Sequence, residues 1–209
     1  MIHPATTLWE LLQERVKKHP HKPLLLFDNS SFTYAEFERE VSRVANGLLR
    51  LGVERGDRIA LLLPNCPEFL FAVFAAAEIG AVFVPINTAF KAEEAGYVLN
   101  HSESSFLVTA ASFLSLVAVI KEKCPRLRRV ITLRGEKGAG CISWDEFLFR
   151  ASDSAPKAAA RPAEIASITY TSGTTDRPKG VMLTQYAYLF APQKRAEALG
   201  WNESDRVIV

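Results

Sequence analysis

A run of hydroxyl side chains around one glycine is the part of this sequence best suited to chemistry. Residues 168–180 read Ile-Thr-Tyr-Thr-Ser-Gly-Thr-Thr-Asp-Arg-Pro-Lys-Gly. Hydroxyl groups can donate hydrogen bonds to phosphate oxygens, a glycine lets the backbone approach a ligand closely, and a lysine adds positive charge. We therefore predict a polyphosphate-binding loop, formed by Thr171, Ser172, Gly173, Thr174, Thr175 and Lys179.

Apolar segments on both sides of this loop are expected to hold it in place. Residues 165–170 have the composition of a buried strand, and residues 181–183 read Val-Met-Leu, which predicts a second strand leaving the turn. A loop held between two strands keeps its hydrogen-bond donors in fixed positions. The polar cluster should therefore be a rigid binding loop.

Two other interpretations of the loop have some basis in the sequence. The spacing from Gly173 to Lys179 approaches the nucleotide-binding pattern Gly-x-x-x-x-Gly-Lys-Ser/Thr. However, Pro178 stands at the second glycine position without an N–H to donate, and Gly180 has no hydroxyl for a magnesium ion. A plain polar surface turn is the other alternative, because Ser, Thr and Gly are common between strands.

The loop resembles the signature Thr-Ser-Gly-Thr-Thr-Gly-x-Pro-Lys-Gly of the adenylate-forming superfamily, and the chain resembles the amino-terminal part of an acyl-CoA synthetase. Weaker matches to that family extend over nearly the whole chain. Physically these segments are scaffold: Thr33 and Glu36 predict a helix-starting capping box, Gly52 a helix end and Pro67 a first helical turn. The matching segments are residues 31–37, 52–60, 64–69 and 80–87.

The resemblance implies a two-step reaction for a full-length enzyme. A small carboxylic acid attacks the α-phosphorus of ATP, and the resulting acyl-adenylate is then taken by a thiol such as coenzyme A. It also implies that residues 171–175 and Lys179 hold the β- and γ-phosphates of ATP, without a catalytic nucleophile or base in this stretch. Adenine contacts, a magnesium ligand, most of the acyl pocket and the coenzyme A site belong to family segments beyond this chain.

Two positions depart from the family pattern. Asp176 stands where the family has Gly or Ser, and Gln185 stands where it commonly has His. A carboxylate about 5 Å from a phosphate charge costs on the order of 3 kcal/mol at an effective dielectric constant near 20. Asp176 should therefore weaken nucleotide binding by about 100-fold unless it points away or shares the magnesium ion. The effect of Gln185 stays open.

Composition narrows the class of protein. The 209 residues are 48% hydrophobic and carry a net charge of +2, which fits a soluble α/β body and gives no reason to expect nucleic acid as a partner. The short basic run at 126–129 is interpreted as a solvated loop. Neither the three cysteines nor the four histidines have metal-ligand spacing, so we predict thiols in a reducing, cytoplasmic compartment and surface or capping histidines. These residues are Cys66, Cys124, Cys141, His3, His19, His21 and His101.

An apolar run at 69–86 approaches membrane-spanning length and contains Glu78 as its single formal charge. Gly80 falls where a helix would end, and residues 81–86 form a mostly apolar run rich in β-branched side chains. A helix followed by a buried strand therefore explains this run better than a transmembrane helix.

The remaining pattern alternates between helices and strands, which predicts an α/β fold with a mainly parallel sheet flanked by helices. A linker rich in Ala, Ser and Pro is expected at about 151–162, ahead of the phosphate loop at 168–180. Helices are expected near residues 7–18, 33–51, 67–79, 91–100, 111–122, 144–150 and 185–199. Strands are expected near residues 24–27, 58–63, 82–85, 105–108, 130–133 and 165–170.

Residues 206–209, Arg-Val-Ile-Val, look like a core strand at the end of the chain. Together with the resemblance, this leads us to expect residues 1–209 to be an incomplete amino-terminal portion of the large domain, lacking the small carboxyl-terminal domain. An unfinished sheet edge would favour self-association. Three alternatives stay open: a truncated nucleotide-binding relative, a structural relative without catalysis, or a fragment of a carrier-protein-loading adenylation domain.

Overall fold

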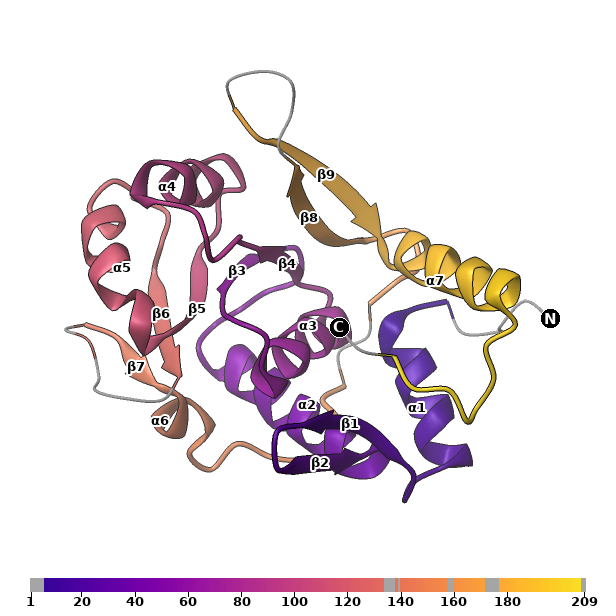
Figure 1. Ribbon diagram of the computed structural model, residues 1–209. Coiled ribbons are helices and arrows are strands. Elements are labelled where there is room, and N and C mark those ends of the chain that lie inside the picture. The colour runs from indigo at the N-terminus through magenta and orange to yellow at the C-terminus, as the bar shows by residue number, and fades with distance from the viewer. Residues whose placement is uncertain (1–5, 134–137, 139, 158–159, 172–176, 208–209) are drawn as a thin grey trace.

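The computed structural model (Figure 1) describes residues 6–133, 138, 140–157, 160–171 and 177–207. Its helices are α1 (Leu8–Lys18), α2 (Tyr34–Arg50), α3 (Pro67–Ile79), α4 (Ala92–His101), α5 (Leu114–Lys121), α6 (Trp144–Leu148) and α7 (Gln185–Leu199), with a short 3-10 helix at Ala111–Phe113. Its strands are β1 (Pro23–Phe27), β2 (Ser30–Thr33), β3 (Arg58–Leu62), β4 (Val82–Pro85), β5 (Phe106–Ala110), β6 (Arg129–Leu133), β7 (Ile142–Ser143), β8 (Ile165–Thr171) and β9 (Lys179–Thr184).

A seven-stranded sheet forms the centre of the fold, in the order β7-β6-β5-β3-β4-β8-β9. Neighbouring strands are parallel except for β8 and β9, which form an antiparallel hairpin. The predicted α/β fold with a mainly parallel sheet is therefore confirmed. Strands β1 and β2 make a separate antiparallel pair, of which the sequence pattern predicted only the first strand.

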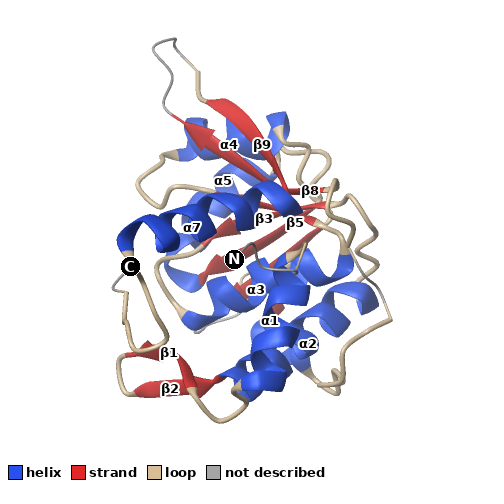
Figure 2. Cartoon of the chain, turned by 90° about the vertical axis from the view of Figure 1, so that its right-hand side faces the viewer, coloured by secondary structure: helices blue, strands red, loops and turns tan. Residues whose placement is uncertain are grey.

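Helices cover both faces of this sheet (Figures 1 and 2). Ile59 and Leu61 of β3 pack into a hydrophobic cluster with α1, α2 and α3, whereas the alternate residues Ala60 and Leu62 pack into a second cluster with α4 and α5. Successive side chains of a strand point to opposite faces of its sheet. This alternation of apolar side chains on both faces is typical of a parallel sheet buried between two helical layers.

The apolar run at 69–86 is a helix followed by a strand, as predicted. Pro67 occupies the first turn of α3, and Gly80 ends the helix in the left-handed conformation at φ 74°. Strand β4 follows directly and is buried between β3 and β8. In the described part of the chain, no helix is long and apolar enough to cross a membrane.

Glu78 lies within α3 and is fully buried. Neither of its carboxylate oxygens has a hydrogen-bond partner within the described residues. Burial, followed by the nearby carboxylate of Glu38, raises the pKa of Glu78 to about 8. The carboxyl group is therefore protonated at neutral pH, because an unpaired buried charge is very costly.

Local signals set the start and end of helix α2. The Thr33 hydroxyl accepts a hydrogen bond from the Glu36 amide at 3.3 Å, and the Thr33 amide donates to the Glu36 carboxylate at 2.8 Å. Gly52 follows the helix with φ 82°. The predicted capping box and the predicted glycine at the helix end are both confirmed.

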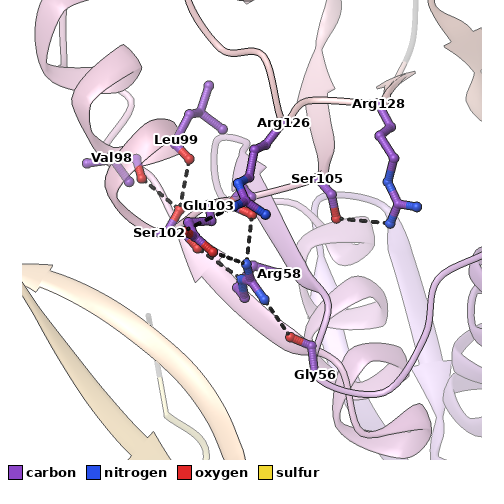
Figure 3. Close-up of polar contacts among 10 residues, drawn as sticks. Gly56, Arg58, Val98, Leu99, Ser102, Glu103, Ser105, Arg126 and Arg128 are labelled. Carbon is purple, nitrogen blue, oxygen red and sulfur yellow. Dashed lines mark hydrogen bonds and ion pairs between the residues drawn. The ribbon is translucent and has the colours of Figure 1, made fainter.

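Ion pairs join the loops that precede β3, β5 and β6 (Figure 3). The Arg58 guanidinium lies 2.8 Å from the Glu103 carboxylate, which Arg126 also approaches at 3.6 Å. Arg128 pairs with Asp57 at 3.0 Å. Arg126 and Arg128 are exposed, as expected for a solvated loop, and their charges are matched by nearby carboxylates.

Hydrogen bonds attach the first residues of the segment 151–162 to helix α2. The side-chain amide of Asn46 on α2 lies within hydrogen-bond distance of the carbonyl oxygens of Ser152 and Ser154, at 3.0 and 2.9 Å. The described residues between 151 and 162 form no helix or strand.

The strand expected at 206–209 is not found at its described residues. Residues 206 and 207 have no regular structure, and Val207 is 57% exposed. The physical reason is the preceding turn: the Asn202 amide donates to Asp205, and Glu203 forms an ion pair with Lys18 at the end of α1. These contacts hold the segment beside α1 instead of along the sheet (Figure 1).

Candidate functional site

The described residues of the phosphate-loop motif belong to the β8–β9 hairpin, which projects from the body of the molecule (Figure 1). Thr171 is the last residue of β8 and pairs with Lys179, the first residue of β9. Both residues are exposed. The structure therefore brings two of the predicted site residues together on neighbouring strands, and confirms the two strands that were expected on either side of the motif.

The predicted residues Ser172, Gly173, Thr174 and Thr175 lie outside the described residues, as does Asp176. The strand before them is firmly placed, because Ala166 and Ser167 of β8 are buried and Ser167 is paired with Phe83 of β4. Strand β8 runs parallel to β4, so its carboxyl end opens on the same edge as those of the other parallel strands. Open α/β sheets bind their ligands at this edge.

Gly180 packs closely against the opposite strand of the hairpin. Added to Gly180, a Cβ atom would lie 2.9 Å from Cγ2 of Ile168 and 3.2 Å from Cζ of Tyr170. Tyr170 is the residue paired with Gly180 in the ladder. The last glycine of the motif therefore has a packing role, since its missing side chain makes room for the Tyr170 ring.

Tyr170 reaches from β8 to helix α4. Its hydroxyl lies 2.7 Å from Nδ1 of His101, and its ring meets the rings of His101 and Tyr97 edge to face. Burial, followed by the neighbouring Tyr97, raises the pKa of Tyr170 to about 12. The phenol therefore stays protonated at neutral pH, which keeps it available as a hydrogen-bond donor.

A second contact with α4 comes from the other side of the loop. The guanidinium carbon of Arg177 lies 5.6 Å from the centre of the Tyr97 ring, within the range of cation–π interactions. Sequence reasoning selected neither Tyr97 nor Arg177 and interpreted His101 as a surface or capping histidine. The spacing of Tyr97 and His101, four residues apart on one helix face, is the signal that could have pointed to them.

Gln185, the second departure from the family pattern, is a buried structural residue. Its Oε1 accepts a hydrogen bond from the Leu8 amide at 3.5 Å, and its Nε2 donates to the Ala77 carbonyl at 3.4 Å. Gln185 is the first residue of α7, so its side chain connects the start of that helix to α1 and α3.

A cavity and the distribution of metal-binding side chains also bear on the position of the site. A polar cavity of about 570 Å³ lies between β2, the start of α2 and residues 151–153, and contains none of the predicted site residues. Within the described ranges, His, Cys, Asp and Glu side chains form no group of three that could hold a metal ion.

The sequence matches the family model of AMP-binding enzymes over residues 12–209, and the chain therefore belongs to this family. It is 37% identical to a crotonobetaine/carnitine–CoA ligase of Salmonella paratyphi B over 193 residues, which are 88% of this chain and 37% of that protein. The same ligase of Salmonella typhi is 36% identical over equal shares. The chain thus spans little more than a third of the length of these curated relatives.

Solved structures of CoA ligases have the same fold. The anthranilate CoA ligase AuaEII, in complex with anthranoyl-AMP, has a TM-score of 0.85 at 26% identity, covering 90% of this chain and 36% of that one. A long-chain-fatty-acid-CoA ligase from Archaeoglobus fulgidus has a TM-score of 0.87 at 26% identity, covering 98% and 42%. The amino-terminal domain of FACL13 from Mycobacterium tuberculosis has a TM-score of 0.71 at 28% identity, covering 86% and 44%.

Proposed function

We propose that residues 1–209 are the amino-terminal part of the large domain of an ATP-dependent acyl-CoA synthetase. This enzyme activates a carboxylic acid as its acyl-adenylate and transfers the acyl group to coenzyme A. The observation that carries the proposal is the β8–β9 hairpin, whose paired ends Thr171 and Lys179 flank the phosphate motif of the AMP-binding family. The CoA ligases among its relatives and structural neighbours support it.

The hairpin geometry suits a triphosphate. Directly paired residues of an antiparallel ladder have Cβ atoms about 5 Å apart, so the Lys179 ammonium and the Thr171 hydroxyl can reach the same phosphate group. With Ser172, Gly173, Thr174 and Thr175 they would hold the β- and γ-phosphates of ATP. Their role is to orient the leaving pyrophosphate and to stabilise its growing negative charge.

The remaining parts of the enzyme are assigned to its continuation past residue 209. These parts are the magnesium ligand, the coenzyme A site, most of the acyl pocket and the small carboxyl-terminal domain. Within residues 1–209 we assign 151–162 as the linker and 168–180 as the phosphate loop. We further propose a cytoplasmic enzyme of fatty-acid or related carboxylic-acid metabolism, since the odd number of cysteines, without Cys-x-x-Cys spacing, suits a reducing compartment.

Acid-dependent exchange of pyrophosphate into ATP tests this function. The assay compares the 209-residue chain with the longer enzyme that contains it, over a panel of carnitine, crotonobetaine, anthranilate and long-chain fatty acids. We expect exchange from the longer enzyme with at least one acid and none from the chain alone, followed by thioester formation when coenzyme A is added.

Each deviation from this result has a defined meaning. Exchange by the chain alone would show that the acyl pocket lies within residues 1–209, contrary to the proposal. ATP binding by the longer enzyme without exchange for any acid would instead favour a nucleotide-binding relative. Transfer to a phosphopantetheine carrier protein but not to coenzyme A would identify a carrier-loading adenylation domain.

A further inference from the structure

We propose that helix α4 positions the phosphate loop by holding one residue on each side of it. The two holding residues are Tyr97 and His101, and the two held residues are Tyr170 and Arg177. We call these four residues the α4 anchor. The inference rests on the proposed function of the loop and adds a positioning site that lies outside the phosphate motif.

The anchor starts from two rings on one face of α4. Tyr97 and His101 are four residues apart, and their ring centres lie 5.2 Å apart at an interplanar angle of 30°. Residues at this spacing are neighbours on a helix surface. The pair therefore presents two neighbouring, mutually tilted rings to the β8–β9 hairpin.

Tyr170 is the first held residue and lies one position before Thr171. Its hydroxyl lies 2.7 Å from Nδ1 of His101, and its ring centre lies 6.4 Å from that of Tyr97 at 85°. Gly180 leaves room for the Tyr170 ring on the hairpin. The end of β8 is thus attached to α4 by a hydrogen bond and by edge-to-face ring contacts.

Arg177 is the second held residue and lies two positions before Lys179. Its guanidinium carbon lies 5.6 Å from the Tyr97 ring centre. Arg177 is exposed, and among the described residues the Tyr97 ring is the contact that orients its side chain. Pro178, with its restricted φ angle, separates Arg177 from Lys179, and the direction in which β9 begins therefore depends on where Arg177 is held.

The two contacts have a joint consequence for the loop. Since Tyr170 and Arg177 both contact Tyr97 of α4, the residues on each side of 172–176 are held against one helix. The Arg177 cation is engaged by Tyr97, which leaves Lys179 as the cation presented at the paired end of the hairpin. Arg177 is therefore a positioning residue and acts on ATP through Lys179 and the loop.

Variants of the longer enzyme test the anchor, with ATP affinity measured by calorimetry and folding checked by circular dichroism. Arg177→Ala and Tyr97→Leu should each weaken ATP binding about three- to tenfold, as expected for loss of a partly exposed cation–π contact. The double variant should bind ATP no more weakly than the weaker single variant, because the Arg177–Tyr97 contact is already lost in either single variant. Tyr97→Phe keeps the ring and should bind within about twofold of the parent.

A packing rescue separates positioning from direct phosphate binding. Arg177→Met carries no charge but can pack on the Tyr97 ring, so it should bind ATP within about threefold of the parent and clearly more tightly than Arg177→Ala. If Arg177→Met is as weak as Arg177→Ala, or if Arg177→Ala is weak while folded Tyr97→Leu is not, Arg177 contacts phosphate itself and the proposal is wrong. Additive effects of the two single changes would also overturn it.

Lys179→Ala separates this inference from the proposed function. Unchanged ATP affinity in Lys179→Ala would remove the phosphate role of the motif, and with it the basis of the anchor. Weakened affinity in Lys179→Ala, together with parent-like affinity in both Arg177→Ala and Tyr97→Leu, would leave the function intact and disprove the anchor alone.

Discussion

Tyr170 lies over Gly180, its partner in the β8–β9 ladder, so closely that a Cβ atom at residue 180 would come within 3.2 Å of the tyrosine ring. The glycine thus lets one aromatic side chain of β8 cross the hairpin and reach His101 on α4. The missing side chain of Gly180 therefore affects how β8, and with it the loop that follows β8, is attached to α4.

Replacing Gly180 by alanine should therefore destabilise the hairpin. The new methyl group would also lie 2.9 Å from Cγ2 of Ile168, and overpacking of this kind typically costs about 1 to 3 kcal/mol. We expect the free energy of unfolding of Gly180→Ala, measured by urea titration, to fall by an amount in this range.

Gly96 provides the matched control for this substitution. It lies inside α4, where an added Cβ would meet Ile120 at an ordinary contact distance of 3.7 Å. Alanine is favoured over glycine within helices by up to about 1 kcal/mol, so Gly96→Ala should stabilise the chain. If Gly180→Ala and Gly96→Ala changed the free energy of unfolding equally, Gly180 would not be closely packed against Tyr170.

Lys179→Ala should weaken ATP binding by the longer enzyme without unfolding it. Loss of a charge-assisted phosphate contact costs roughly 1.5 to 3 kcal/mol, which corresponds to about a 10- to 150-fold higher dissociation constant. Calorimetric titration of ATP measures the change. Lys157→Ala, at an exposed lysine in the linker, should bind ATP like the parent.

Asp176→Gly should have the opposite effect on ATP affinity. Removing a carboxylate from the loop removes its repulsion of the phosphates, and glycine restores the family residue. The same titration measures the gain. An unchanged or lower affinity would show that the carboxylate faces away from the phosphates or shares the magnesium ion.

Stability should fall with rising pH because of Glu78. The folded state raises the pKa of this carboxyl from 4.5 to about 8, so between these values the folded chain keeps a proton that the unfolded chain releases. The free energy of unfolding should therefore decrease from about pH 4.5 to about pH 8, by roughly 3 to 5 kcal/mol in total. Urea titrations at pH 5 and pH 8.5 measure the difference.

The Glu78→Gln substitution isolates this group. The amide does not titrate, so the variant should lose much of the pH dependence and should be more stable than the parent at pH 8.5. Glu122→Gln, at an exposed glutamate, serves as the control and should keep the parent profile. Parallel pH profiles for Glu78→Gln and the parent would rule out this role of Glu78.

The 209-residue chain should self-associate through β9. This strand ends the sheet, and Val181 and Met182 on it are 45% and 65% exposed. An edge strand with apolar side chains is prone to pair with another chain, and a lysine on the edge opposes such pairing. Met182→Lys should reduce the concentration-dependent light scattering of the parent. Val119→Lys, at a residue of α5 that is 56% exposed, should leave it unchanged.

The sequence predicted the parts of the fold that depend on near neighbours. Four residues that start or end a helix affect only the backbone within about one turn of their own position. These residues are Thr33, Glu36, Pro67 and Gly80, and all four have their predicted roles. Strand β7 escaped prediction because it is only two residues long, and β2, which reads Ser-Ser-Phe-Thr, because it has a single apolar residue. Whether such short segments form strands depends on partners elsewhere in the chain.

The candidate site also combines features that local sequence predicts with contacts between residues far apart in the chain. The phosphate motif could be read directly from residues 171–180, because its residue types and order carry the chemistry. The contacts of Tyr170 with His101 and of Gln185 with Leu8 span 69 and 177 residues. No local pattern encodes such contacts, so the α4 anchor and the buried role of Gln185 required the structure.

The pairing of β8 with β4 also bears on the order of folding. Phe83 and Ser167 meet in the sheet although more than eighty residues separate them, whereas β3, β4 and β5 pair with neighbours much closer along the chain. Contacts between distant residues form late, since the entropy of closing a long loop opposes them. We therefore expect strands β3 to β6 to pair before the phosphate motif leaves the ribosome during synthesis, so that the binding loop is added to a sheet that has already begun to form.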